Sequence, residues 1–157
     1  MKTLDYLQLD PAKAEKTVEG LQRLLANLQL YYTNLRGYHW NVTGVEFFGA
    51  HEKYEEYYDD TADKVDEVAE RILMLGATPA HKFSDYLKVA DIKESGVVTS
   101  AKKIAVELLD QLKVLLEVER EVLELAGDND DEGTIDLMTG FITEQEKTVW
   151  MLTAYVS

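Results

Sequence analysis

The feature that most restricts the fold of this chain is the spacing of its apolar residues, which recur every three or four positions along four long segments. Only two prolines and nine glycines occur in 157 residues, so long helices meet few breaks. Apolar residues at this spacing line one face of an α-helix, whereas a half-buried strand needs a spacing of two. The sequence therefore predicts an all-α protein.

The segments predict four helices of similar length with recognisable start and stop signals. Asp10 is a suitable N-cap and Pro11 a suitable first helical residue, while Gly76 and Pro79 end the second helix. The predicted ranges are 11 to about 37–39, about 45 to 75, about 99 to 126 and about 133 to 155. The residues predicted to form the buried stripes are Val18, Leu21, Leu24, Leu25, Leu28, Tyr31, Tyr32, Leu35, Phe47, Tyr54, Tyr58, Val65, Val68, Ile72, Ile104, Leu108, Leu112, Leu115, Leu116, Leu137, Phe141, Val149 and Leu152.

The lengths of the connections distinguish between kinds of helical bundle. The first and third connections are short, which predicts two antiparallel hairpins, but the link from Gly76 to Ser100 is long. A long middle link permits a crossover along the bundle, as in the ferritin-like arrangement. We therefore expect one ferritin-like four-helix bundle over residues 1–157, with a short extra helix at about 83–90 in the crossover between the second and third helices.

Composition and charge exclude several classes of function. A hydrophobic content of 46% suits one domain with a substantial core. The chain has 16 basic and 30 acidic residues, a net charge of −14, so its surface should attract cations and repel nucleic acid. It has no cysteine, which excludes disulfides and thiolate chemistry. It also lacks a signal-peptide pattern and a membrane-spanning apolar run, so we expect a cytoplasmic protein without membrane contact.

Two histidines and two carboxylates form the most informative candidate site. Asp66 and Glu70 lie one helical turn apart, and His51 precedes them on the same predicted helix. At a rise of about 1.5 Å per residue, His51 and Asp66 are roughly 22 Å apart, too far for one chain to place both on one metal ion. If two copies of this helix cross antiparallel near residues 59–60, His51 of one copy lies opposite both carboxylates of the other. The alternative is a solvated acidic face.

Imidazole nitrogen and carboxylate oxygen suit Fe(II), although Zn(II), Mn(II) or Co(II) could also bind. A di-iron site inside one subunit would use Glu-x-x-His on two helices. Arg36, Phe48 and Thr78 stand three residues before the histidines, so that motif is absent. A ferritin-type di-iron site inside one subunit is therefore disfavoured.

The run HWNVTGVEFFGAHEKY, followed by DEVAERILMLGATP, resembles the Dps proteins, the DNA-binding proteins from starved cells or mini-ferritins. The resemblance covers nearly the whole chain, through the ending WMLTAY. The family pattern of two histidines twelve residues apart, then Asp after fifteen more and Glu after another four, is matched by His39, His51, Asp66 and Glu70.

The resemblance implies a hollow homo-dodecamer with ferroxidase centres at twofold interfaces, in which these four residues are the catalytic metal ligands. Two irons per centre are expected. The centres would oxidise Fe(II), preferentially with hydrogen peroxide, and the shell would store Fe(III) mineral. The protein would then serve iron storage, iron homeostasis and protection against oxidative stress.

Two acidic clusters match further features of the family. Glu52, Glu55 and Glu56 resemble its mineral nucleation site, and the alternative is a solvated helix face. The run of residues 128–132, which includes Asp130 and Asp131, resembles with Asp136 the lining of its negative threefold pores. The same pore residues could also cap the last helix.

Two other functions are open at this point, namely DNA compaction by the shell and an inert structural bundle. DNA compaction in some members of the family uses a lysine-rich terminal extension. Here Lys2 is the only basic residue before the first helix, Asp5 and Asp10 oppose it, and no basic tail precedes Ser157. We therefore expect DNA binding to be weak or absent. His81 has no evident partner, and we expect a surface histidine there.

Overall fold

The computed structural model describes residues 3–157, so Met1 and Lys2, including the basic residue considered above, lie outside the described part of the chain. Within that part the chain forms helices and no named strand. The helices are α1 (Leu4–Leu7), α2 (Pro11–Asn41), α3 (Phe47–Met74), α4 (Phe83–Val89), α5 (Ala101–Gly127) and α6 (Glu132–Val156). The predicted all-α class is confirmed.

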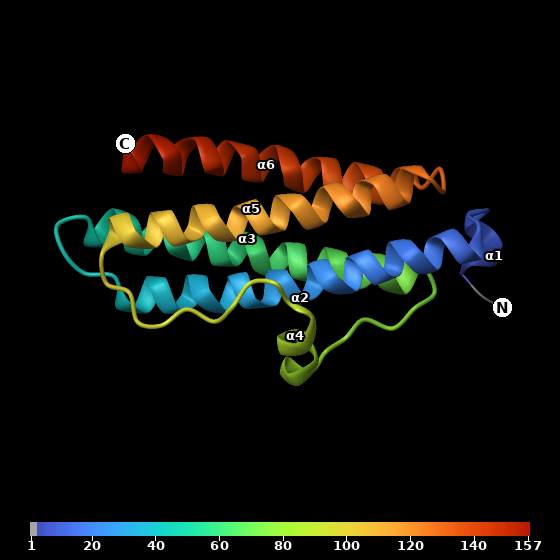
Figure 1. Cartoon of the computed structure of the whole chain (residues 1–157), viewed down its shortest axis with the longest axis horizontal. Helices are drawn as coiled ribbons and strands as arrows, with labels where there is room; N and C mark the ends of the chain where they lie inside the picture. Colours follow the sequence, from blue (N-terminus) through green and yellow to red (C-terminus); the bar gives the residue numbers. More distant parts are fainter. Residues whose placement is uncertain (1–2) are drawn as a thin grey trace.

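The four long helices lie side by side, as Figure 1 shows. α2 and α3 form one antiparallel hairpin, and α5 and α6 form the other. Between them the crossover returns along the outside of α2 and carries α4, so α3 and α5 run in the same direction. The ferritin-like bundle with an extra helix in the crossover is thus confirmed. No helix between residues 3 and 157 is long and apolar enough to cross a membrane.

The helix ends agree with the predicted signals except at the end of α2 and at α1, which was not predicted. Asp10 caps α2 by accepting a hydrogen bond from the backbone N of Lys13 at 3.0 Å. The prediction that this helix fades at residues 37–39 was wrong. The helix continues through Gly37 to Asn41, because one glycine costs a helix only about 0.5–1 kcal/mol and the burial of its neighbours Leu35 and Tyr38 outweighs that cost. At the end of α3, Gly76 adopts a φ of 82°, which favours glycine and ends the helix there.

The predicted stripes form one core between the helices. Most of their residues are buried, and the remainder, Val18, Tyr32, Phe47, Tyr58, Val65, Leu116, Leu137 and Val149, are half-buried at its margin. Burial of each large aliphatic side chain contributes about 1.5–3 kcal/mol to stability. The core thus follows from apolar spacing alone.

Two buried asparagines of α2 attach the crossover to the bundle. Asn27 Oδ1 accepts hydrogen bonds from the backbone N of Asp91 and of Ile92, at 3.0 and 2.9 Å. Asn34 Oδ1 accepts one from the backbone N of Ser95 at 2.9 Å, and its Nδ2 donates to the Lys93 carbonyl. Buried backbone amides need such partners, so these asparagines determine where the crossover lies.

Candidate metal centre

His39 and His51 form a reciprocal pair where the end of α2 meets the start of α3. The Nδ1 atom of His39 is 2.7 Å from the backbone carbonyl of His51, and the Nδ1 atom of His51 is 2.8 Å from that of His39. The two rings are stacked, with centroids 3.7 Å apart and planes inclined by 18°. The pair depends on the extension of α2 to Asn41, which keeps His39 within its last helical turn.

These contacts determine the tautomer of both rings. A carbonyl oxygen only accepts, so each Nδ1 must carry the hydrogen, and the neutral ring keeps an unprotonated Nε2. Neither Nε2 makes a hydrogen bond within residues 3–157. A donor bond from one ring nitrogen to a backbone carbonyl is the usual way in which proteins orient a metal-binding histidine. The arrangement therefore leaves the Nε2 atoms of both rings without a partner within residues 3–157.

Aromatic neighbours hold the rings in place. Phe47 stacks on His51 with centroids 5.0 Å apart, and Tyr58 meets His39 edge-on at 5.4 Å. Tyr32 in turn packs edge-on against Tyr58 at 6.0 Å. His39 is only 8% exposed, so its orientation is fixed by packing as well as by hydrogen bonding.

The two candidate carboxylates lie elsewhere on the same chain. Asp66 and Glu70 are exposed on α3, and neither side chain makes a hydrogen bond or ion pair with another described residue. The separation of fifteen helical residues keeps Asp66 roughly 22 Å from His51. Within residues 3–157, no three side chains of His, Cys, Asp or Glu gather closely enough to hold a metal ion. One chain thus brings the histidines together but not the carboxylates.

The acidic clusters differ in exposure. Glu52, Glu55 and Glu56 all lie on exposed positions of α3, where Glu56 pairs with Lys53. Of the predicted pore residues, Asp130 and Asp136 are exposed.

Asp131 differs from the other predicted pore residues because it is only 2% exposed. Its Oδ1 accepts from the backbone N of Thr134 at 3.0 Å and pairs with Arg71 of α3 at 2.5 Å. Its Oδ2 accepts from the Thr134 hydroxyl at 2.6 Å. Both carboxylate oxygens are thus engaged within the chain, where they cap α6 and attach it to α3.

A buried polar cluster that was not predicted lies among the long helices. Lys64 of α3 is 5% exposed and Glu119 of α5 is fully buried, with Gln145 of α6 donating to Glu119 at 2.5 Å. Burial raises the pKa of the Glu119 carboxyl to about 8, although Gln145 and Lys64 oppose the shift. The available signal was register, because Lys64 is spaced with Val68 and Ile72 along the apolar stripe of α3.

Comparisons with known proteins agree with this architecture. Residues 18–157 match the ferritin-like domain family. The chain is similar to the DNA protection during starvation protein of Porphyromonas gingivalis, with 50% identity over 156 residues, 99% of this chain and 98% of the relative.

Solved structures give the same result. The Dps protein of Vibrio cholerae, described as a member of a broad superfamily of ferritin-like diiron-carboxylate proteins, matches with a TM-score of 0.93 at 50% identity, covering 95% of this chain and 94% of that one. A Dps protein from Bacillus brevis matches with a TM-score of 0.90 at 32% identity, covering 93% and 98%. The chain therefore belongs to the ferritin-like family and, within it, to the Dps proteins.

Proposed function

We propose that this protein stores and detoxifies iron, oxidising Fe(II) at centres that two copies of the chain build together. The carrying observation is the reciprocal pair of His39 and His51, whose Nδ1 atoms are both engaged by backbone carbonyls. This leaves both Nε2 atoms free to bind a metal. In the proposed centre, Asp66 and Glu70 of a second copy supply the oxygen ligands.

The proposed substrates are Fe(II) and hydrogen peroxide. Two Fe(II) ions at one centre give two electrons to one peroxide molecule, which with two protons yields two water molecules and two Fe(III) ions. A paired reaction thus avoids the hydroxyl radical that a one-electron step would release. Imidazoles and carboxylates suit this reaction because they bind both Fe(II) and Fe(III) and leave coordination positions open.

The surface of the chain supports assembly into a shell, for which we propose a dodecamer. Near the histidine pair, Trp40 is 67% exposed and Phe48 is 84% exposed. On α4, Phe83 and Leu87 are exposed as well. Large apolar side chains grouped on a surface are typical of protein contacts. These two regions therefore suit burial against other copies.

We further propose roles for the exposed acidic residues in handling the iron cargo. Glu52, Glu55 and Glu56 would nucleate the Fe(III) mineral, because clustered carboxylates concentrate the ion. Asp130 and Asp136 would line a cation pore. Asp131 would support that pore by capping α6, since both its oxygens are engaged. We also propose a cytoplasmic location.

The names of the relatives mention DNA protection, but the charge of this chain opposes direct binding. A net charge of −14 per chain repels the phosphate backbone. We propose that any protection of DNA comes from removal of Fe(II) and peroxide. An inert helical bundle, by contrast, would not explain why two imidazoles are oriented by their Nδ1 atoms while both Nε2 atoms have no partner within residues 3–157.

The proposal is tested by replacing both carboxylates, Asp66→Ala with Glu70→Ala. We expect the rate of Fe(II) oxidation by peroxide, measured by stopped-flow absorbance, to fall by about two orders of magnitude or more. Loss of a residue that only hydrogen-bonds to a metal ligand already lowers metal affinity or activity by about 10–100-fold, and here the ligands themselves are removed. The control variant carries Glu15→Ala with Glu19→Ala, an exposed carboxylate pair of the same spacing on α2. If the Asp66→Ala, Glu70→Ala variant oxidised Fe(II) as fast as the control variant, the proposed centre would be wrong and the inert helical bundle would be favoured.

A further inference from the structure

Arg36 of α2 is a cation for which its own chain supplies no anionic partner. Its guanidinium nitrogens make no hydrogen bond or ion pair with any residue between 3 and 157, although the chain has 30 acidic residues. The inner nitrogen, Nε, is buried, whereas the two terminal nitrogens stay accessible. A guanidinium has five N–H donors and no acceptor, so the terminal nitrogens can bind a carboxylate from outside the chain.

Two aromatic rings hold this guanidinium in place. Its Cζ atom lies 4.8 Å from the centroid of the Tyr32 ring and 5.4 Å from that of the Trp40 ring. Tyr32 precedes Arg36 by four residues and Trp40 follows it by four, so the three side chains line one face of α2. Such cation–π contacts position the charge without using its N–H donors. The cation is therefore fixed while its terminal donors remain unpaired.

The cation belongs to the same surface as the histidine pair. His39 follows Arg36 by three residues and so lies about one helical turn away. Tyr32 packs edge-on against Tyr58, and Tyr58 packs edge-on against His39. Arg36 and the imidazoles thus border one aromatic cluster, next to the exposed Trp40.

The height of Arg36 along the bundle follows from the histidine contact. The reciprocal contact sets His39 of α2 level with His51 of α3. Because α2 and α3 are antiparallel, Arg36 lies level with about residue 54 of α3. A carboxylate that pairs with Arg36 must therefore come from a second copy and reach this level.

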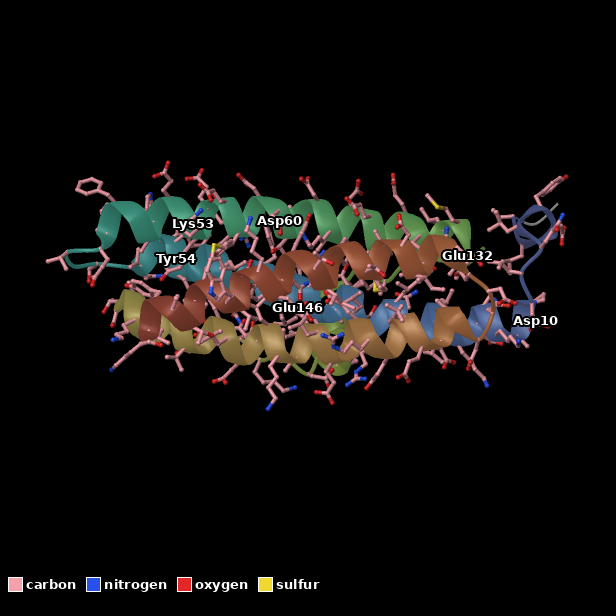
Figure 2. The ribbon with its side chains drawn as sticks, turned by 90° about the horizontal axis from the view of Figure 1, so that it is seen from above. Asp10, Lys53, Tyr54, Asp60, Glu132 and Glu146 are labelled. Carbon is pink, nitrogen blue, oxygen red and sulfur yellow. The ribbon has the colours of Figure 1, made fainter. Side chains whose placement is uncertain are left out.

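The proposed shared centre brings a second copy of α3 to this level. Two copies that cross near residues 59–60 cross about midway along α3, where Figure 2 shows Asp60. Twofold symmetry then sets residue 54 of one copy level with about residue 65 of the other. Asp66 is the acidic residue nearest to this level, and its side chain has no hydrogen bond or ion pair within residues 3–157 of its own chain. The unpaired cation and the unpaired carboxylate thus lie at the same height.

We propose that the guanidinium of Arg36 binds Asp66 of the second copy in a charge-assisted hydrogen bond, a pairing that rests on the shared iron centre of the proposed function. Carboxylates that bind a metal are commonly held by a further hydrogen bond, which fixes their orientation. Arg36 is then a positioning residue, because it holds one oxygen of Asp66 and leaves the other for Fe(II). Each twofold contact has two such pairs, and these also help to hold the copies together.

The test measures the exchange of chains between assemblies of the whole protein, without iron. Isotope-labelled and unlabelled assemblies are mixed, and native mass spectrometry follows the appearance of mixed shells. The variants are Arg36→Gln, Asp66→Asn and the two combined. The matched control is Arg120→Gln on α5, because Arg120 is exposed and pairs with Glu146 of its own chain.

We expect chains to exchange roughly tenfold faster in Arg36→Gln than in Arg120→Gln, because loss of one partner of an interfacial charge pair speeds dissociation. Asp66→Asn should have a similar effect, and the combined variant should exchange no faster than either single variant. Exchanging the charges, through Arg36→Asp with Asp66→Arg, should restore slow exchange but not Fe(II) oxidation, since a metal ligand is lost.

Two results would overturn the proposal, namely exchange in Arg36→Gln as slow as in the control, and effects of Arg36→Gln and Asp66→Asn that simply add. So would coupling of Arg36→Gln to Asp63→Asn in place of Asp66→Asn. If the single variants fail to assemble, recovery of assembly on exchanging the charges supports the proposal, and no recovery overturns it. Failure of the proposed function is distinct, because it appears as unchanged Fe(II) oxidation after Asp66→Ala with Glu70→Ala.

Discussion

At the scale of single residues, the oriented imidazoles of His39 and His51 contrast with the buried carboxyl of Glu119. His39 and His51 are oriented with one ring nitrogen free, which is the condition for binding a metal. Glu119 is fully buried, and its Oε2 has no hydrogen-bond partner within residues 3–157. Its carboxyl is thus held in an environment that favours the neutral form.

The pH dependence of Glu119 can be measured directly. Its pKa is about 8 in the folded chain against an ordinary value of 4.5, so from about pH 4.5 to about pH 8 the folded state binds a proton that the unfolded state has lost. The contribution of Glu119 to stability therefore falls as pH rises through this window. Glu119→Gln should remove the loss and stabilise the protein at pH 7 by about 3 kcal/mol at most.

The measurement is denaturant unfolding of both proteins at pH 5, 7 and 8, where the stability difference should widen with pH. Glu117→Gln, an exposed position on the same helix, is the control. A difference that does not change with pH would show that Glu119 is ionised in the folded protein.

At the scale of elements, the crossover depends on a few buried amides. The crossover has only one short helix of its own, so its backbone groups need partners on other elements. Asn27, which is fully buried, accepts from two consecutive backbone N–H groups of the crossover. Hydrogen bonds from α2 to the crossover therefore fix the position of α4 and of its exposed apolar side chains.

Asn27→Ala tests this dependence. The change leaves the N–H groups of Asp91 and Ile92 without their acceptor, and we expect a loss of about 3 kcal/mol, because each unpaired buried donor costs about 1–3 kcal/mol. Hydrogen exchange should accelerate at these two amides first. Thr33→Ala, which removes a hydrogen bond internal to α2, should change stability by less than about 1 kcal/mol. Unaltered exchange at Asp91 and Ile92 would mean that other contacts hold the crossover.

At the scale of the whole molecule, the proposed centre is incomplete in one chain. The histidine pair lies where the end of α2 meets the start of α3, and the carboxylates lie far along α3, so only a second copy can bring them together. A twofold contact would create two equivalent centres per pair of chains.

Mixed assemblies test whether the centre is shared. One variant lacks the imidazoles, through His39→Ala with His51→Ala, and the other lacks the carboxylates, through Asp66→Ala with Glu70→Ala. Each alone should be inactive, but unfolding and reassembling them in equal amounts should restore roughly a quarter of the wild-type Fe(II) oxidation rate, because half of the pairs are mixed and each of those has one intact centre of two. No recovery in verified mixed shells would place the centre within one chain.

The sequence by itself determined the fold class, most of the core and the presence of a long crossover. These features depend on short stretches of sequence. Apolar spacing sets the buried face of each helix, Asp10 and Pro11 start α2, and Gly76 ends α3, so no long-range contact is needed to predict them. The sequence also pointed to His39, His51, Asp66 and Glu70, and their assignment as one shared centre stays a prediction.

Only the tertiary structure decided how the polar side chains are used. The mutual hydrogen bonds of His39 and His51 require the end of α2 to meet the start of α3. The ion pair of Asp131 with Arg71 requires the end of α3 to lie beside the start of α6. The ion pair of Lys64 with Glu144 likewise requires α6 to pack against α3. Such pairings join residues far apart in sequence, so their energies depend on packing that no local pattern encodes.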